Sequence, residues 1–285
     1  TFNSIWRQES AGRWRIVFDK GAAVCPPAAV APDPTAKPVV ADLIRGLPAY
    51  ARDALAAWRA PGMAIAVVQD GRVVLAQGFG QRAVDQSAPV DAHTRFATAS
   101  LIKGFTAAVA AAQVHAGGLL WDEPIVAKLP DFALHDPRVT AELTLCDVLA
   151  HRSGLDESAD LLWLGTGYDQ DEVLQRLRAV PQASPLRSTF SYSNVLYVAA
   201  GKLVAQSAGS PWEDVIRTRL FGPLGMRDSG FGVPQASDGN WARPHAEHDG
   251  SVRPIAPRDV HNIAPAAAVY SSAADMARWL LLLLG

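Results

Sequence analysis

The chain has 285 residues but little cysteine, almost no net charge and no long apolar run. Its two cysteines, Cys25 and Cys146, are too few for a disulfide scaffold or a zinc cage, and we expect both to be free thiols. A formal net charge of −2 provides no basic field that would attract nucleic acid or anionic lipid. The apolar run at residues 279–284 is far shorter than the roughly 20 residues that a membrane-spanning helix needs.

Length and composition favour a folded chain of one or two domains. Hydrophobic residues make up 49% of the chain and charged residues 19%, which excludes a wholly disordered protein. At roughly 150 residues per domain, the length allows one large domain or two small ones. The sequence begins at Thr1, shows no signal-peptide pattern and stops directly after a leucine run, so we expect a fragment of a longer protein.

Changes in pattern divide the chain into three parts. Residues 1–20 predict a β-hairpin, with strands at Phe2 to Arg7 and Trp14 to Phe18. This segment weakly resembles the last strands of the cone-shaped α+β family that includes polyketide cyclases, which implies the end of a preceding domain. Residues 21–38 are rich in proline and alanine and predict an extended linker. Residues 39–285 are predicted to form the main domain.

The main domain alternates between strand and helix patterns. A helical pattern at 39–58 is predicted to break at Gly46-Leu47-Pro48, and residues 63–69 and 72–78 predict a hairpin around Asp70-Gly71. Helices are predicted at 100–115 and 195–206, whereas 230–265 is predicted to be mostly loop or irregular strand. Strands at one end and helices in the middle predict an α/β (α+β) domain, in which helices flank a sheet and form an insertion.

The first candidate for chemistry is the pair Ser100 and Lys103. Residues i and i+3 of a helix lie on one face with Cβ atoms about 5–6 Å apart, so the hydroxyl and the ammonium can meet. A serine needs a neighbouring base to become a nucleophile, and a desolvated lysine can serve as that base or orient another one. The alternative is a helix-capping serine beside a surface lysine. Apolar neighbours on both sides of Lys103 make the functional interpretation about as probable as that alternative.

The second candidate is Tyr192-Ser193-Asn194. In an extended segment, Tyr192 and Asn194 would face the same site. A neighbouring ammonium would lower the pKa of the Tyr192 hydroxyl, which could then act as a general base, and Asn194 could contact a substrate carbonyl or hold Lys103. A buried tyrosine satisfied by the backbone is the more common alternative. For His151, which precedes Arg152-Ser153-Gly154, we predict a structural role in a helix-terminating turn.

Other sites are disfavoured by the sequence. The chain has no Gly-x-Ser-x-Gly motif of the α/β-hydrolase type. The glycines at 78–83 approximate a dinucleotide fingerprint, but Pro89 and polar residues follow where a helix should begin. His245, His248 and His261 lie in a segment rich in glycine and proline that lacks a scaffold for a metal site.

Taken together, the motifs resemble the serine β-lactamase and penicillin-binding-protein superfamily, in particular its class C-like hydrolases, esterases and D-amino-acid peptidases. The resemblance runs from about Ala41 to the C-terminus. The segments that carry it, in chain order, are PGMAIAVVQDGRVV, FATASLIKGFTA, LTLCDVLAHRSGL, FSYSNVLYVAAGKLV, FGPLGMRDSGF and APAAAVYSSAADMARWL. It implies a β-lactamase/transpeptidase-like fold and a serine hydrolase that forms an acyl-enzyme on an amide or ester.

The resemblance also assigns roles to the candidate residues. It implies Ser100 as the acylated nucleophile, Lys103 and Tyr192 as the proton-handling pair, and Asn194 as a residue that contacts the substrate or belongs to the hydrogen-bond network of the site. No metal or organic cofactor is implied, the partner is a small-molecule or short peptide substrate, and a periplasmic or secreted location is expected. The family's third motif, Lys-Thr-Gly or His-x-Gly, normally follows the DMARWL helix, so we expect the chain to be truncated before it. An inactive fragment or a non-catalytic binding module is the alternative.

Overall fold

The computed structural model describes residues 3–10, 13–20, 40–234 and 239–285. Its strands are β1 (Asn3–Ser10), β2 (Arg13–Lys20), β3 (Gly62–Gln69), β4 (Arg72–Gly80), β5 (Phe96–Ala97), β6 (Gly230–Phe231), β7 (His245–His248), β8 (Ser251–Pro254) and β9 (Val269–Ser271). The α-helices are α1 (Val40–Trp58), α2 (Lys103–His115), α3 (Pro137–Glu142), α4 (Leu145–Leu149), α5 (Gln170–Arg176), α6 (Asn194–Ala208), α7 (Trp212–Ile216), α8 (Gly222–Leu224), α9 (Ala264–Ala267) and α10 (Ala273–Leu284).

The predicted hairpin at the start of the chain is confirmed. Strands β1 and β2 pair antiparallel, from Asn3 opposite Lys20 to Ser10 opposite Arg13. The predicted linker 21–38 lies outside the described residues, as does Cys25, so only Cys146 is observed as a free thiol. That residues 1–20 end a preceding domain stays a prediction.

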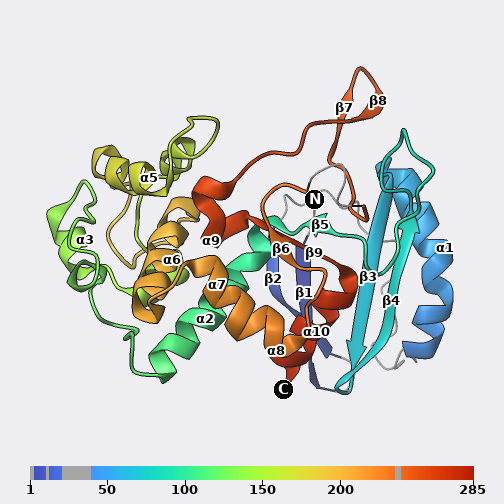
Figure 1. Ribbon diagram of the computed structural model, residues 1–285, viewed down its shortest axis with the longest axis horizontal. Helices are drawn as coiled ribbons and strands as arrows, with labels where there is room; N and C mark the ends of the chain where they lie inside the picture. Colours follow the sequence, from blue (N-terminus) through green and yellow to red (C-terminus); the bar gives the residue numbers. More distant parts are fainter. Residues whose placement is uncertain (1–2, 11–12, 21–39, 235–238) are drawn as a thin grey trace.

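The hairpin of β3 and β4 forms around the predicted turn. Asp70 and Gly71 both have positive φ, 48° and 69°, which a two-residue type I′ turn requires. The register runs from Gly62 opposite Gly80 to Gln69 opposite Arg72. Figure 1 shows this hairpin between α1 on its outer side and α10 on its inner side. Strands β5, β9 and β6 form a second antiparallel sheet, in that order.

The predicted break within the first helix is wrong. Helix α1 continues through Pro48 to Trp58. A proline in a helix interior removes one backbone hydrogen bond, but alanine and leucine on both sides favour the helix, and Ala51 and Leu55 bury its inner face. The helix ends at Trp58, and Arg59 after it adopts a positive φ of 53°.

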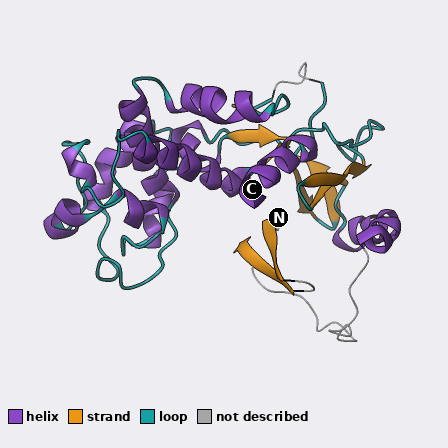
Figure 2. Ribbon diagram, turned by 90° about the horizontal axis from the view of Figure 1, so that it is seen from below, coloured by secondary structure: helices purple, strands orange, loops and turns teal. Residues whose placement is uncertain are grey.

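Helices α2 and α6 cross at the centre of the main apolar core (Figure 1). Helix α2 begins with a turn of 3₁₀ helix, η1 (Ala99–Ile102), and stops before Gly117, whose φ is 77°. Helix α6 ends at Gly209, which is left-handed with φ 67°. Both helices therefore begin and end close to the predicted positions. In Figure 2 most of the helices (purple) lie together on the left, whereas α1 and α10 pack against the β3–β4 strands.

A buried carboxylate anchors the segment before the candidate site. Asp147 of α4 is 1% exposed and accepts hydrogen bonds from Thr144, Arg152 and Arg187. Burial alone would raise the pKa of Asp147, but the hydrogen bonds from Arg187 and Thr144 outweigh it, so the pKa lies below its ordinary value. This anchor ties the turn at His151–Arg152 to residue 187, just ahead of Tyr192.

We predict that Phe105→Ala destabilises the fold by about 3–5 kcal/mol, because it opens a cavity in the core. Phe105 is fully buried on α2, and its ring packs edge-to-face on Trp279 at 4.8 Å and on Phe221 at 5.8 Å. The urea midpoint should fall at an unchanged m-value. Leu43→Ala, at an exposed position on α1, is the control and should change stability by less than about 0.5 kcal/mol. Equal midpoints for the two variants would contradict the prediction.

Candidate active site

Ser100 lies in the turn that leads into α2. Ala99, immediately before it, has a positive φ of 45°, which is uncommon for a residue with a side chain. Thr98 anchors the same turn, because its hydroxyl donates to the carbonyl of Val269 on β9 at 2.7 Å. Ser100 is the second residue of the 3₁₀ turn Ala99–Ile102, and the first N–H groups of a helix have no partner within the helix. The N–H of Ser100, at the start of a helix, is available to a developing negative charge.

Lys103 sits one helical turn after Ser100 and is 4% exposed. Its Nζ donates to Ser100 Oγ at 3.1 Å, to Asn194 Oδ1 at 2.6 Å and to the carbonyl of Ala266 at 3.1 Å. Three acceptors match the three protons of an ammonium group. The same nitrogen lies over the Tyr192 ring, 4.7 Å from its centroid, and 5.3 Å from that of Tyr197. The environment is therefore built for a buried cation.

Tyr192 completes the contact with Ser100. Its hydroxyl donates to Ser100 Oγ at 2.5 Å, so this oxygen contacts both the phenol and the ammonium. The prediction that the pKa of Tyr192 is lowered is wrong. Burial raises its pKa, the hydrogen bond to Ser100 offsets this in part, and the Asp160 carboxylate adds to the increase. In the resting arrangement the phenol is therefore protonated.

Asn194 is the first residue of α6 and faces the same group of side chains. Ser193 before it is extended, with φ −143° and ψ 120°, and its hydroxyl accepts from the N–H of Leu196 as the helix cap. The Asn194 Oδ1 accepts from Lys103, and the Nδ2 donates to the Asp160 carboxylate at 2.5 Å. Asn194 thus contacts the lysine, as one of its two predicted roles requires.

His151 has the predicted structural position. It follows α4 with a φ of 56°, and its Nδ1 accepts a hydrogen bond from the N–H of Ser193 at 3.1 Å. The imidazole stacks on the Tyr192 ring at 4.5 Å and lies 5.2 Å from the Tyr197 ring. The turn therefore supports one face of the phenol.

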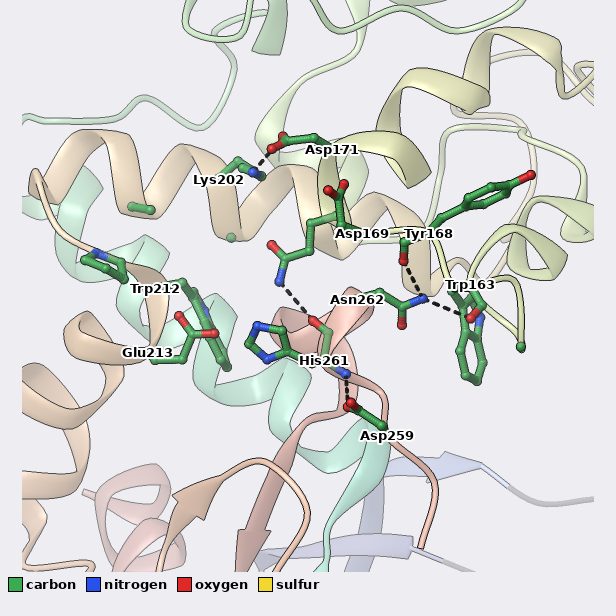
Figure 3. A pocket seen from close by; sticks show the side chains of 16 residues that line it. Trp163, Tyr168, Asp169, Asp171, Lys202, Trp212, Glu213, Asp259, His261 and Asn262 are labelled. Atoms are coloured by element: carbon green, nitrogen blue, oxygen red, sulfur yellow. Dashed lines mark hydrogen bonds and ion pairs between the residues drawn. The ribbon is translucent and has the colours of Figure 1, made fainter.

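Two cavities adjoin this region and share Trp163. One, of about 530 Å³, opens onto Ser100 and Asn194 and is also lined by Phe96, Trp163, Tyr270 and Ile263. The other, of about 660 Å³, has walls from α5, α6 and α7 (Figure 3). Figure 3 shows Asn262 reaching the backbone oxygens of Trp163 and Tyr168, at 3.0 and 3.1 Å, and Lys202 paired with Asp171. Ser100, Lys103 and Tyr192 do not line this larger cavity.

The described residues contain no group of three or more histidine, cysteine, aspartate or glutamate side chains that could hold a metal ion. His245 and His248 lie on β7, whereas His261 lies in the 3₁₀ turn His261–Ile263 beside the larger cavity. Among the helices described, none has the length and apolar character to cross a bilayer.

Two contacts of the site have no signal in the sequence. Asp160 lies in a 3₁₀ segment, η3 (Glu157–Leu162), 34 residues before Asn194, and the carbonyl of Ala266 belongs to α9. Both are placed by tertiary packing. A single aspartate in a polar loop and a backbone oxygen cannot be distinguished from their many equivalents by spacing or composition.

Comparisons with known proteins identify the family and the fold. The sequence profile of the Beta-lactamase family matches residues 11–285. The unguisins hydrolase of Aspergillus violaceofuscus is 30% identical over 87% of this chain and 46% of its own length, and the esterase EstB of Burkholderia gladioli is 32% identical over 80% and 60%. The octameric penicillin-binding protein homologue of Pyrococcus abyssi superposes with a TM-score of 0.72 at 26% identity, over 84% of this chain and 56% of its own. The chain spans about half the length of the curated relatives it matches.

We predict that the Tyr192 hydroxyl titrates above pH 10, because burial raises its pKa. The measurement is the phenolate absorbance of the protein minus that of Tyr192→Phe, followed to the onset of unfolding. Tyr50→Phe, which removes an exposed phenol of α1, controls for the loss of one chromophore. A difference curve with its midpoint below pH 10 would show that the neighbouring ammonium, and not burial, dominates.

Proposed function

Because the chain belongs to the Beta-lactamase family, we propose that it acts as a serine hydrolase that forms an acyl-enzyme on an amide or ester. The observation that carries the proposal is the pair of contacts at Ser100 Oγ, 3.1 Å from Lys103 Nζ and 2.5 Å from the Tyr192 hydroxyl. A nucleophile within hydrogen-bond distance of two proton-transfer groups is the arrangement that covalent catalysis requires. The relatives named as hydrolase and esterase support the same reaction class.

The proposed acylation step begins with one proton removed from the Lys103/Tyr192 pair. Ser100 Oγ attacks the substrate carbonyl carbon, and its proton passes to the Tyr192 oxygen while Lys103 stabilises the charge on that oxygen. The N–H of Ser100 donates to the oxyanion of the tetrahedral intermediate. The family resemblance implies that the second oxyanion donor comes from the Lys-Thr-Gly or His-x-Gly motif. The pair then returns a proton to the leaving group, and water releases the acyl group by the reverse sequence.

The proposed substrates are a β-lactam, a D-amino-acid peptide or a simple carboxylic ester. These share one acyl-transfer chemistry, and the walls of the cavity beside Ser100 would discriminate between them. Turnover of nitrocefin, a D-alanyl peptide and p-nitrophenyl acetate by one preparation compares the three classes directly. A periplasmic or secreted location is proposed from the family resemblance alone.

We predict that a fluorophosphonate labels the protein once, at Ser100. The Oγ–P bond forms, the P–F bond breaks and fluoride leaves, so intact mass and peptide mapping locate the adduct. Ser100→Ala should label at least about 10³-fold more slowly, because it removes the nucleophile. Ser251→Ala, at an exposed position of β8, should label like the unaltered chain. Absence of an adduct at Ser100 would favour the non-catalytic binding module.

We predict that the labelling rate rises with pH into the alkaline range. The raised pKa of Tyr192 means that the proton is lost from the pair only as the pH increases, and the base-competent form grows accordingly. Tyr192→Phe should be slower by about 10²–10⁴-fold and lose this dependence. Tyr168→Phe, in the larger cavity, is the matched control and should keep both rate and profile. An unchanged alkaline rise in Tyr192→Phe would assign the base role to Lys103 instead.

A further inference from the structure

The Asp160 carboxylate holds Asn194 by both its backbone and its side chain. Its Oδ1 accepts from the N–H of Asn194 at 2.9 Å and from that of Val195 at 3.4 Å. Its Oδ2 accepts from the Nδ2 of Asn194 at 2.5 Å. A carboxylate that receives three N–H groups from two adjacent residues holds the first turn of α6, beside the Ser193 cap, and fixes the orientation of the Asn194 amide.

The orientation of that amide bears on Lys103. Because Nδ2 donates to Asp160, the Oδ1 faces Lys103 Nζ at 2.6 Å, closer than Ser100 Oγ or the carbonyl of Ala266, which both lie at 3.1 Å. A reversed amide would place an N–H₂ group against the ammonium and an oxygen against the carboxylate, so both contacts would become repulsive. Asp160 therefore selects the amide orientation that keeps Nζ beside Ser100 Oγ.

Charge supports the same arrangement. Lys103 is 4% exposed, and a buried ammonium is costly unless compensating groups lie near it. Asp160 supplies a negative charge one amide group away, and it also acts on Tyr192, whose pKa it helps to raise. The chain of contacts runs from the carboxylate through one amide to the ammonium and the serine.

We propose that Asp160 is a positioning residue that sets the orientation of the Asn194 amide and, through it, the place of Lys103 beside Ser100. The proposal rests on the proposed serine hydrolase function, because its effect is measured as the reactivity of Ser100. It adds to the site a residue that acts through its contacts with Asn194.

The experiment measures the rate at which a fluorophosphonate labels Ser100 in Asp160→Asn. The new amide has the size of the carboxylate, but one of its ends donates, so it cannot accept from all three N–H groups. We expect labelling to slow by about ten- to a hundredfold, as for loss of a hydrogen bond to a charged group. The matched control is Asp156→Asn, since Asp156 caps the same η3 segment, through the N–H of Ser158, without contacting Asn194.

Two further readouts separate positioning from stability alone. In Asp160→Asn the alkaline rise in labelling rate should move to lower pH, because a charge that raises the pKa of Tyr192 is gone. The double variant D160N/N194D exchanges carboxylate and amide, so the hydrogen bond runs in the reverse direction: the amide at 160 donates to the carboxylate at 194, which still accepts from Lys103. It should recover most of the pH-independent limiting rate that D160N and N194D each lose.

The outcomes are distinguishable. If the unaltered chain is not labelled at Ser100, the proposed function fails. If it is labelled, and D160N stays within about twofold of it or the double variant is no faster than either single variant, the positioning role is overturned. Thermal unfolding of each variant shows whether it is folded at the assay temperature. If D160N alone does not fold, the comparison of D160N/N194D with N194D still decides, since of these two only the double variant pairs a donor at one position with an acceptor at the other.

Discussion

The buried ammonium of Lys103 is the constraint around which the site is organised. An amine removed from water needs an acceptor for each proton, and the three come from three segments: the turn before α2, the start of α6 and the carbonyl of Ala266 in α9. Satisfying one lysine therefore requires that these segments pack together. Two of the acceptors lie on helices that pack in the main core. The packing of that core therefore sets the positions of Lys103 and Ser100 relative to each other.

The buried phenol of Tyr192, beside this ammonium, is held in its neutral form. Burial stabilises the neutral form of Tyr192, while an adjacent ammonium favours the ionised form. Burial is the larger effect, so the pKa of Tyr192 lies above its ordinary value. A protonated phenol can donate to Ser100 Oγ, as it does at 2.5 Å, but cannot accept a proton until the pair has lost one. The arrangement thus holds the proposed nucleophile in place at rest and leaves its activation to the shared protonation state of two groups.

Local features of the fold were predictable because their causes are local. The Asp70-Gly71 turn, the glycine ends of α2 and α6, and the i, i+3 spacing of Ser100 and Lys103 each depend on a few neighbouring residues. The contact between Lys103 and Asn194, 91 positions apart, was one of two roles left open for that amide, because spacing does not show which distant segments meet. Pro48 inside α1 and the raised pKa of Tyr192 were mispredicted for one reason: burial and packing, which spacing does not encode, outweighed the local preference. Asp160 could not be found, since nothing near it in the sequence marks its partner.

Backbone strain lies at the two places where the site meets its supports. Ala99, directly before Ser100, and His151, whose ring stacks on Tyr192, are both non-glycine residues with positive φ, at 45° and 56°. Such conformations cost of order 1–3 kcal/mol each and persist only where the surroundings over-determine them. At Ala99 the surroundings are the Thr98 bond to β9 and the start of α2, and at His151 they are the Ser193 N–H and three aromatic rings. Each strained residue adjoins one member of the Ser100–Tyr192 contact: Ala99 precedes Ser100, and the His151 ring stacks on Tyr192. The packing that supplies acceptors to Lys103 therefore also offsets the cost of orienting Ser100 and Tyr192.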